Sequence, residues 1–367
     1  MARSLPDGRT LGLAFLGCGS ITRRHARLIG KTWPEVARFY ASRDAARAEA
    51  CLSELSGVAS FGSYREAIED ERVDAVVVAT PTVSHLELTL AALAAGKDVI
   101  VEKPPFMRSA DFERVEAAER SSGRRVFVGE NYFYRPLVRR LREVITRGDI
   151  GEVRYLVVKA LKAQDTGGWR DDAAIAGGGA LFEGGIHWVN LMGGIGLTVE
   201  SAHGYRPGLT PRMSPRSEAT GTRTQGYPRP AAADDMPFAS APVASLRGDI
   251  SAERSMLVVF RYAEGAVGTL FHAWDTPSLL KGLRLSRIYG TEGSIAFESN
   301  GLFLAVFGKR PRIIFPGFRD ISGYRAMFAD YLACIRSGRE PHMTLARARR
   351  DLELVEAAYR SIPFSGD

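Results

Sequence analysis

A glutamate and a histidine stand four residues apart in the stretch GGGALFEGGIHWVN, residues 177–190. That spacing places Glu183 and His187 on one face of a helix. An imidazole exchanges a proton close to neutral pH, and a neighbouring carboxylate fixes its tautomer and favours its protonated form. The pair therefore fits general acid–base catalysis. The same stretch also fits a glycine-rich turn before an ordinary buried helix, so the rest of the chain must supply the partners that decide.

A glycine-rich turn directly after the first apolar run has the form of a dinucleotide-binding loop. GCGSIT, residues 17–22, follows a strand-like run and opens a helix-like segment. Its first glycine allows a tight turn, and its second lets the backbone approach a pyrophosphate that the helix N-terminus attracts. Thr22 stands where the motif normally has Gly or Ala. The expected contacts are with the turn and the first helical residues, Gly17, Gly19, Ser20 and Ile21.

The end of the second strand-like segment bears on the choice between NAD and NADP. An acid there binds the ribose 2′-hydroxyl, whereas an arginine accommodates a 2′-phosphate. The sequence reads ASRD, with Ser42 and Arg43 at the expected tip and Asp44 one step beyond. A guanidinium binds phosphate bidentately and a serine hydroxyl adds a hydrogen bond. These residues favour NADP(H), while NAD(H) stays possible if Asp44 is the ribose ligand.

Length and charge limit the classes of protein that fit. A chain of 367 residues with 45% hydrophobic and 25% charged residues predicts a globular protein of two domains. The net charge of +7 is spread along the chain, with arginines interleaved with acids. We therefore expect no nucleic-acid partner, although a basic balance suits a phosphorylated cofactor or an anionic substrate.

Cysteine usage and the N-terminal segment bear on compartment. Cys18, Cys51 and Cys334 are odd in number, far apart and without the spacing of a metal site. This pattern argues against a disulfide framework and against bound metal, and suits a reducing cytoplasm. The polar start MARSLPDGRT and the short apolar run after it predict neither a targeting signal nor membrane association.

The first third of the chain alternates between apolar strand-like runs and helix-like segments. Residues 11–17, 36–42 and 74–80 are nearly continuous apolar runs with amphipathic stretches between them. Strands of this kind are buried on both faces, as in a doubly wound parallel sheet. The sequence therefore predicts an α/β Rossmann domain over residues 1–130.

The remainder has a different pattern, with strand-like pieces joined by short turns and two helical segments at the end. It predicts an α+β domain over residues 131–367, built on an open, mainly antiparallel sheet. The C-terminal helices are candidates for packing back on the first domain. Residues 206–248 are rich in Pro, Gly and Arg, a composition that favours a mobile insertion over a structured lid.

Several motifs together carry a family resemblance. TPTVSHLELTLAALAAGKDVIVEKPP, residues 80–105, contains T-P-x-x-x-H, then A-G-K, then E-K-P, and WRDDAAIAGGGALFEGGIHWVN covers residues 169–190. GEVRYL and AYRS extend the similarity toward the C-terminus. In this combination the chain resembles the glucose–fructose oxidoreductase/inositol dehydrogenase (Gfo/Idh/MocA) family over nearly its whole length, except for residues 206–248.

The resemblance implies reversible hydride transfer between a nicotinamide and a carbinol carbon, usually of a sugar, cyclitol or polyol. It also implies a Rossmann domain followed by an open sheet whose outer face forms homodimers or homotetramers.

The resemblance also implies the main catalytic roles. Lys103 matches the E-K-P lysine near the nicotinamide and the reacting oxygen, where a charged ammonium would stabilise a developing alkoxide. Glu102 shapes that turn. His187 matches the acid/base histidine. Glu183 stands where the family normally has a catalytic Asp, and Asn190 replaces a second Asp.

Other positions are implied around the cofactor. Arg170 matches an arginine expected near the cofactor, and Trp169 lies beside the site. The residues expected to line the cofactor cleft or to approach the nicotinamide are Thr80, Pro81, His85 and Asn131. The implied substrate contacts are Lys103, Trp169, His187 and Asn190. Three further histidines are not accompanied by such motif residues in the sequence, and we expect them to be structural or surface residues: His203, His272 and His342.

Two other functions stay open. Transient oxidation beside a leaving group would allow elimination or glycoside cleavage, with the nicotinamide returned unchanged. A dinucleotide-binding sensor without catalysis is the third possibility, although both Lys103 and His187 are present.

Overall fold

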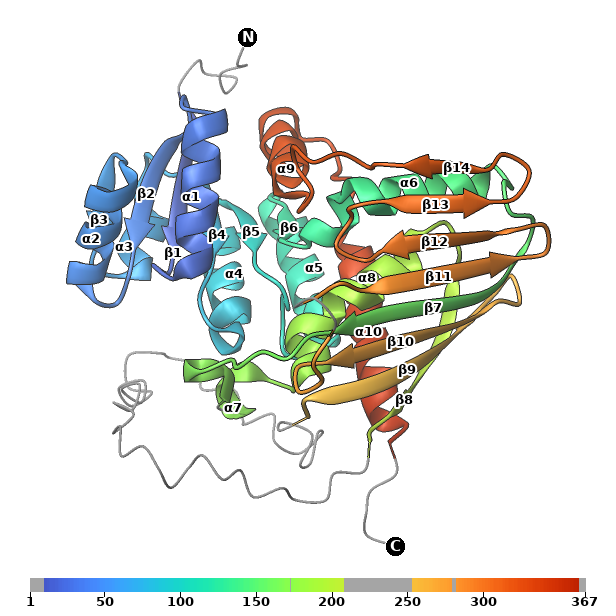
Figure 1. The fold of residues 1–367 in the computed structure, drawn as a ribbon. Coiled ribbons are helices and arrows are strands. Elements are labelled where there is room, and N and C mark those ends of the chain that lie inside the picture. Colours follow the sequence, from blue (N-terminus) through green and yellow to red (C-terminus); the bar gives the residue numbers. More distant parts are fainter. Residues whose placement is uncertain (1–9, 172, 208–252, 279–281, 363–367) are drawn as a thin grey trace, which may run out of the picture.

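The computed structural model describes residues 10–171, 173–207, 253–278 and 282–362. Figure 1 shows a blue-to-cyan half built on one sheet and a second half built on a larger, curved sheet. Most of the 206–248 insertion predicted from the sequence therefore lies outside the described residues. No described helix has the length and apolar character needed to cross a membrane.

The first half is a six-stranded sheet in which every pairing is parallel. Its strands, in spatial order, are β3 (Ala59–Phe61), β2 (Ala37–Ala41), β1 (Gly12–Leu16), β4 (Ala75–Val78), β5 (Asp98–Val101) and β6 (Val126–Val128). The central strands are buried at every position because helices cover both faces. The strand order reverses between β1 and β4, where nucleotides bind in folds of this kind. The Rossmann prediction is confirmed.

The connections of this half carry the helices. These are α1 (Ser20–Thr32), α2 (Ala45–Leu55), α3 (Tyr64–Glu69), the short turn η1 (Thr82–Ser84), α4 (His85–Ala94) and α5 (Asp111–Ser122). A 3₁₀ turn, η2 (Asn131–Tyr134), follows β6 and leads into α6 (Pro136–Thr146).

The second half is an eight-stranded sheet. Its order is β14 (Arg312–Ile314), β13 (Leu304–Phe307), β12 (Ser294–Glu298), β11 (Leu285–Gly290), β7 (Val153–Leu161), β10 (Val267–Ala273), β9 (Ser255–Tyr262) and β8 (Val199–Tyr205). All neighbours are antiparallel except β7 and β10, which run parallel. The prediction of a mainly antiparallel sheet is confirmed.

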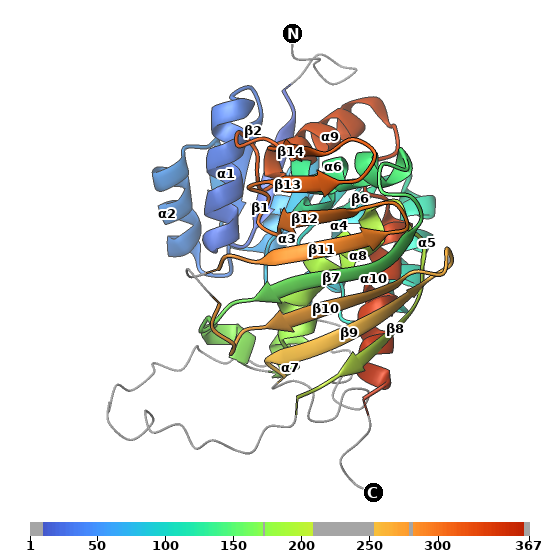
Figure 2. The ribbon, with the colours of Figure 1, turned by 45° about the vertical axis from the view of Figure 1, so that its right-hand side comes forward.

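One face of this sheet is packed and the other is open. Helices α6, α8 (Ile186–Gly194) and α10 (Leu345–Arg360) lie behind the inner face, and Figure 2 shows the outer face uncovered. Leu156 and Val158 of β7 are buried inward, whereas Tyr155 is 60% exposed on the outer side. This alternation is typical of an antiparallel sheet with one solvated face.

Three short elements and one long helix complete the chain. The segment before α8 contains η3 (Gly168–Asp171), α7 (Ala173–Ala176) and a π-helical turn, η4 (Leu181–Gly185). Helix α9 (Tyr324–Ser337) comes late in the sequence but packs on the first sheet, where Phe328 and Tyr331 join a cluster with Phe15 and Phe127. The two halves therefore share buried surface.

Candidate active site

The dinucleotide-type turn lies at the carboxyl end of β1. Gly17 has φ 106°, which favours glycine, and a Cβ there would lie 2.6 Å from the carbonyl oxygen of Ala79. Apart from its chain neighbours, no described residue lies within 4 Å of a Cβ built on Gly19, which precedes α1. No described side chain caps the N-terminus of α1, so its first N–H groups are available to an anion. The turn fits a pyrophosphate.

The structure shows why position 22 is threonine, where the dinucleotide-binding motif normally has Gly or Ala. Its hydroxyl donates a 2.6 Å hydrogen bond to the carbonyl oxygen of Gly17, and the side chain is fully buried. The threonine therefore closes the turn from inside α1. The other two predicted contacts, Ser20 and Ile21, begin that helix.

At the tip of β2 the carboxylate is used for capping. Asp44 accepts hydrogen bonds from Ala46 N at 3.1 Å and Arg47 N at 3.3 Å, which caps α2. The Ser42 hydroxyl accepts a hydrogen bond from Asp44 N at 3.1 Å. Arg43 is exposed and makes no ion pair with another described residue. Arg43 is thus the free polar side chain at this tip.

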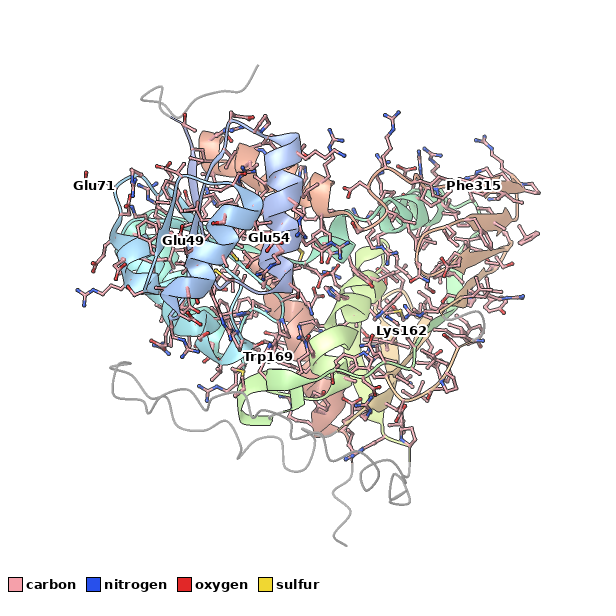
Figure 3. The ribbon with its side chains drawn as sticks, turned by 60° about the vertical axis from the view of Figure 1, so that its left-hand side comes forward. Glu49, Glu54, Glu71, Lys162, Trp169 and Phe315 are labelled. Carbon is pink, nitrogen blue, oxygen red and sulfur yellow. The ribbon has the colours of Figure 1, made fainter. Side chains whose placement is uncertain are left out.

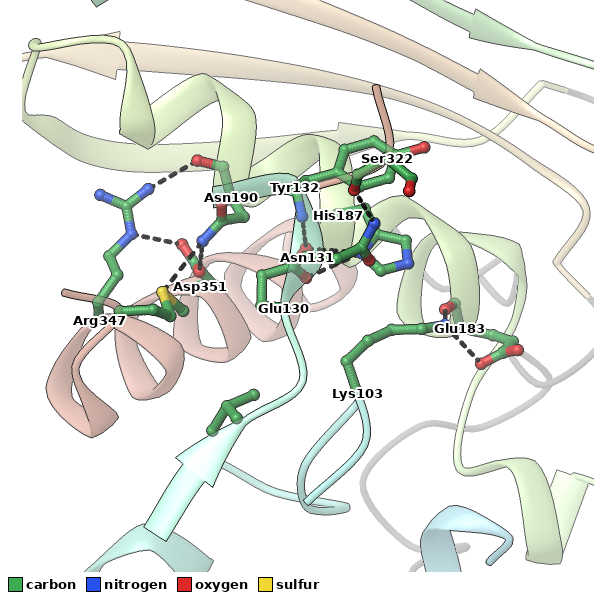
Figure 4. A network of polar contacts seen from close by, with 12 residues as sticks. Lys103, Glu130, Asn131, Tyr132, Glu183, His187, Asn190, Ser322, Arg347 and Asp351 are labelled. Atoms are coloured by element: carbon green, nitrogen blue, oxygen red, sulfur yellow. Dashed lines mark hydrogen bonds and ion pairs between the residues drawn. The ribbon is translucent and has the colours of Figure 1, made fainter. Parts of the chain in front are cut away.

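Lys103 follows β5 and reaches across to the second half. Its Nζ donates a 2.7 Å hydrogen bond to the Glu183 carbonyl oxygen and lies 3.5 Å from Glu183 Oε2 (Figure 4). The Lys103–Pro104 peptide bond is cis. The ammonium is therefore held at the junction between the two halves.

Glu102 is anchored beneath this lysine. His25 of α1 lies 2.6 Å from Glu102 Oε1 through its Nε2, and both residues are buried. Burial by itself would raise the pKa of Glu102, but the His25 hydrogen bond and the nearby charges lower it. This pair connects the dinucleotide-binding helix to the lysine turn.

Glu183 serves as the counter-ion of two cations. Arg170 donates from Nε to Glu183 Oε1 at 2.7 Å, and Lys103 lies on the other oxygen. Burial opposes ionisation, yet the charges of Lys103 and Arg170 hold the pKa of Glu183 below its usual value. The Arg170 guanidinium also stacks over Trp169 at 4.4 Å, and Figure 3 shows Trp169 where the two halves meet.

His187 takes its carboxylate from another element. Its Nδ1 lies 2.7 and 2.9 Å from the two oxygens of Glu130, which is 2% exposed at the start of η2 (Figure 4). Tyr132 stacks on the imidazole, with ring centroids 4.4 Å apart and planes at 10°. A neutral ring held in this way donates from Nδ1 and has an unprotonated Nε2 that can accept a proton.

The expectation that Glu183 fixes the His187 tautomer is therefore corrected. Glu183 lies in the π-helical turn η4, and its carboxylate contacts Lys103 and Arg170. Glu130 has the orienting position instead. The sequence signal for it was weak, a single glutamate at the end of the strand-like segment RRVFVGEN, and no spacing rule links residue 130 to residue 187.

Glu253 holds the start of η4 in place, and the sequence analysis did not identify it. Its Oε2 accepts hydrogen bonds from Leu181 N at 3.0 Å and from Tyr359 Oη at 3.1 Å. A Cβ on Gly179 would lie 2.5 Å from the Glu253 carbonyl oxygen, so the close approach requires glycine. Burial raises the pKa of Glu253 to about 7. The glycines of this stretch therefore serve packing around η4.

Asn190 does not lie where a substrate contact was expected. It is fully buried between α8 and α10, and its Nδ2 donates a 2.6 Å hydrogen bond to Asp351 (Figure 4). Arg347 donates to the same carboxylate at 3.0 Å. The structure thus argues against a substrate role for Asn190. An Asp at position 190 would face a second buried carboxylate, which accounts for the asparagine.

Replacing Asn190 by Asp is expected to lower the free energy of unfolding by about 3 kcal/mol at neutral pH. Burial raises the pKa of Asp351 to about 6, and a second carboxyl raises the pKa of the pair further. Protonation relieves the repulsion, so the loss is largest above pH 6 and shrinks as the pH falls below it. Denaturant unfolding at several pH values measures this. In the double variant Asn190→Asp with Asp351→Asn, stability should recover, and a persistent deficit would contradict the pairing.

His85, Thr80 and Pro81, three of the residues predicted to line the cofactor cleft, follow β4. His85 is buried, and its nitrogens contact the carbonyl oxygens of Pro104 at 3.0 Å and Thr80 at 2.9 Å. Burial lowers the pKa of His85, while the carbonyl oxygens around the ring oppose that shift. The ring braces the end of β4 against the lysine turn. Thr80 itself lies against the dinucleotide turn, because its Cγ2 is 3.3 Å from a Cβ built on Gly17, and Pro81 follows it.

Asn131 presents a buried acceptor. Its Nδ2 donates to the carbonyl oxygen of Ser322 at 2.6 Å (Figure 4). Its Oδ1 is buried and has no hydrogen-bond partner in the part of the chain that the structure describes. Buried amide oxygens are normally paired. The unpaired oxygen therefore fits an amide-bearing group, as the nicotinamide carboxamide would be. Among the described residues no cluster of His, Cys, Asp or Glu has the form of a metal site.

His272 is one of the three histidines that the sequence analysis left outside the site, and it is buried. It is 3% exposed on β10, and its Nδ1 would lie 3.4 Å from a Cβ on Gly185. Burial, followed by the charges of Arg284 and His187, lowers the pKa of His272 to about 3, so the ring is neutral. It packs beside η4, the turn that leads into α8.

A parallel nucleotide-binding sheet joined to an open sheet, with a lysine and an oriented histidine at their junction, defines a two-domain oxidoreductase of the dinucleotide-binding type. Residues 11–130 match the model of the oxidoreductase family with an NAD-binding Rossmann fold, and residues 138–296 match the GFO/IDH/MocA C-terminal domain. The chain belongs to the Gfo/Idh/MocA family of oxidoreductases.

Curated relatives include several sugar and cyclitol dehydrogenases. The chain is 27% identical to levoglucosan dehydrogenase of Pseudarthrobacter phenanthrenivorans, over 65% of this chain and 59% of that protein. It is 33% identical to inositol 2-dehydrogenase of Salmonella paratyphi B, over 39% and 44%. The matches span 34 to 59% of the length of the first relatives.

Solved structures share the fold over almost the whole chain. An oxidoreductase domain protein from Kribbella flavida has a TM-score of 0.76 at 22% identity, covering 96% of this chain and 97% of that one. Levoglucosan dehydrogenase in complex with NADH has a TM-score of 0.77 at 20% identity, covering 96% of each chain. Both have the same two-part architecture.

Proposed function

We propose that this protein is an NAD(P)-dependent dehydrogenase or reductase. It transfers hydride between the nicotinamide and a hydroxyl or keto carbon of a sugar-, cyclitol- or polyol-like substrate. The observation that carries the proposal is the convergence of Lys103 and His187 at the junction of the halves, each beside a carboxylate. The names of the relatives, levoglucosan dehydrogenase and inositol 2-dehydrogenase, support the substrate class.

The residues present fit the cofactor. The Gly17–Gly19 turn and the open N-terminus of α1 would hold the pyrophosphate, and Asn131 would meet the carboxamide. When bound, the nicotinamide supplies the hydride acceptor or donor.

The side chains supply the proton chemistry. In the oxidative direction, Nε2 of His187 takes the hydroxyl proton as the C–H electron pair leaves as hydride and the carbonyl forms. Lys103 stabilises the negative charge that develops on the oxygen. Glu130 stabilises the imidazolium that results, because it holds Nδ1–H with both oxygens within 2.9 Å. In reduction the same proton returns to the oxygen.

The test is a turnover assay on the purified full chain with NAD⁺ or NADP⁺ and a panel of inositols, aldoses and anhydrosugars. Net change in nicotinamide absorbance with at least one member is expected. Bound nicotinamide that returns unchanged while a leaving group is released would favour the redox-neutral elimination. Cofactor binding without any conversion would favour the sensor, and failure to bind either cofactor would contradict all three functions.

We further propose that NADP(H) is the preferred cofactor, because Arg43 is free while Asp44 caps α2. Replacing Arg43 with Ala is expected to weaken NADP⁺ binding about tenfold, as for a lost charge-assisted hydrogen bond, and to leave NAD⁺ binding unchanged. Calorimetric titration measures both. Arg65→Ala, which removes an exposed arginine of α3, is the control. Equal losses for the two cofactors would contradict the assignment.

We also propose a homodimer or homotetramer formed through the open sheet. The outer face exposes Tyr155, Phe271 and Tyr289 on three adjacent strands, and these strands line a shallow hollow. A second copy would cover this apolar surface.

A reducing cytoplasm suits the chain, since Cys18, Cys51 and Cys334 are all free.

A further inference from the structure

Two arginines form hydrogen bonds with Asn300, which follows the end of β12. Strands β7 and β12 end on the side of the second sheet that faces the first half (Figure 1). Arg135 donates from Nη2 to the Asn300 carbonyl oxygen, and Arg284 donates from Nη1 to Asn300 Oδ1 at 3.4 Å. Arg284 precedes β11 and also donates to the carbonyl oxygen of Leu161, the last residue of β7, at 3.1 Å. Both guanidinium groups therefore lie where these strands end.

Neither guanidinium has a carboxylate within ion-pair distance among the described residues. Glu298 is near, but its oxygens accept hydrogen bonds from the backbone N–H groups of Arg284, Asn300 and Leu302 and from the Asn300 amide. Arg135 is 4% exposed, and its buried Nη1 has no hydrogen-bond partner among the described residues. The charge of Glu298 acts on both guanidinium groups, but its oxygens contact neither of them. Buried cations are normally paired, so the two described guanidinium groups lack a carboxylate in direct contact.

The two arginines are connected to the catalytic histidine by stacked rings. The Arg135 guanidinium lies 4.4 Å from the centroid of Tyr132, whose ring stacks on His187 at 4.4 Å. The Arg284 guanidinium lies over Trp188 at 5.5 Å, and Trp188 meets Tyr132 edge-on at 5.2 Å. Arg135 thus lies one aromatic ring away from the imidazole that would contact the reacting hydroxyl, and Arg284 lies two rings away.

We propose that Arg284, supported by Arg135 and Asn300, binds an anionic substituent of the substrate. The inference rests on the proposed function, because it places the reacting carbinol at His187 and the anionic group at the far side of Tyr132. The substrate class is then an acidic sugar or cyclitol. Arg284 is the contact residue because its guanidinium is only partly buried, whereas Arg135 is enclosed and adds charge from behind. A carboxylate and a phosphate share the chemistry that a guanidinium recognises.

The experiment compares matched acidic and neutral ligands. The cofactor-loaded full chain is titrated with D-glucuronate against D-glucose, and with glucose 6-phosphate against glucose, so that the two arms separate carboxylate from phosphate. At least one acid is expected to bind about tenfold or more tightly than its neutral partner, as for a charge-assisted hydrogen bond. Binding of that acid should weaken as salt is added.

Two variants make the comparison specific. Arg284→Met keeps an unbranched chain over Trp188 but removes the charge, and it should reduce the acid-to-neutral preference about tenfold or more. Arg287→Met removes an exposed arginine of β11, the strand that follows Arg284, and should leave the preference unchanged. Equal binding of acid and neutral ligands, no binding by either acid, or a preference that survives Arg284→Met would overturn the proposal.

Failure of this proposal is distinguishable from failure of the proposed function. If the protein turns over nicotinamide with a neutral sugar or inositol but shows no preference for acids, the dehydrogenase proposal stands and the proposal of an anionic substituent fails. Loss of cofactor binding would remove both.

Discussion

Replacing Lys103 with Met is expected to lower the turnover number by about 10³-fold, as for the loss of one group that stabilises a developing oxyanion. Methionine has a similar length without charge, so the alkoxide would develop beside an apolar chain. Cofactor affinity should change little, because the pyrophosphate turn and Asn131 are untouched. Steady-state kinetics and a cofactor titration on the same preparation measure both quantities.

The fold should survive this substitution. Glu183 keeps its 2.7 Å hydrogen bond with Arg170, so its carboxylate is not left unpaired. Thermal unfolding checks that point, and Lys31→Met, at the exposed C-terminal end of α1, is the matched control. Turnover within a few-fold of the parent protein would show that Lys103 does not contact the reacting oxygen.

Replacing Glu130 with Gln is expected to lower the turnover number by about 10²- to 10⁴-fold, the range seen when an acid–base histidine loses its carboxylate partner. The amide can still accept a hydrogen bond from Nδ1–H, but it carries no negative charge to stabilise the imidazolium. The acidic limb of the pH–rate profile for alcohol oxidation should therefore move to lower pH, because the imidazolium loses the charge that stabilises it.

Glu183→Gln is the informative comparison. Glu183 contacts Lys103 and Arg170 rather than the imidazole, so its loss should move this acidic limb less than the loss of Glu130. A limb that moves with Glu183→Gln and stays in place with Glu130→Gln would return the orienting role to Glu183. The two variants together decide which carboxylate serves the histidine.

The sheets could be predicted from sequence because their strands have distinct patterns. Residues 74–80 form a nearly continuous apolar run, and a strand buried on both faces requires that pattern. Residues 153–161 instead mix Val and Leu with Arg, Tyr and Lys, as one solvated face requires. The parallel pairing of β7 with β10 carries no such signal, since register between distant strands depends on tertiary packing.

The site could be predicted only where motifs mark it. Lys103 and His187 lie in recognisable stretches, and the structure brings the segments that carry them together. Glu130 could not be found in this way, because it comes from the end of β6 and meets a helix 57 residues further along the chain. The role of Glu183 could not be predicted from its four-residue spacing, because spacing does not show which side chains from other elements, here Lys103 and Arg170, the carboxylate contacts.

The convergence of charged side chains from distant elements was the hardest feature to predict from the sequence. Arg135 and Arg284 are 149 positions apart in sequence, and only the folded sheet shows that both reach Asn300. In the sequence they are two of many arginines spread along a basic chain. Their lack of a carboxylate is a property of burial and geometry, which composition does not report.

The position of α9 has a consequence for how the protein is made. Phe127 of β6 lies against Tyr331, with ring centroids 5.1 Å apart, and the Tyr331 hydroxyl donates a hydrogen bond to the carbonyl oxygen of Val128. The first 130 residues therefore leave the ribosome with one apolar flank that only a much later segment can cover. Until that helix emerges, the nascent nucleotide-binding half exposes a surface that chaperones recognise.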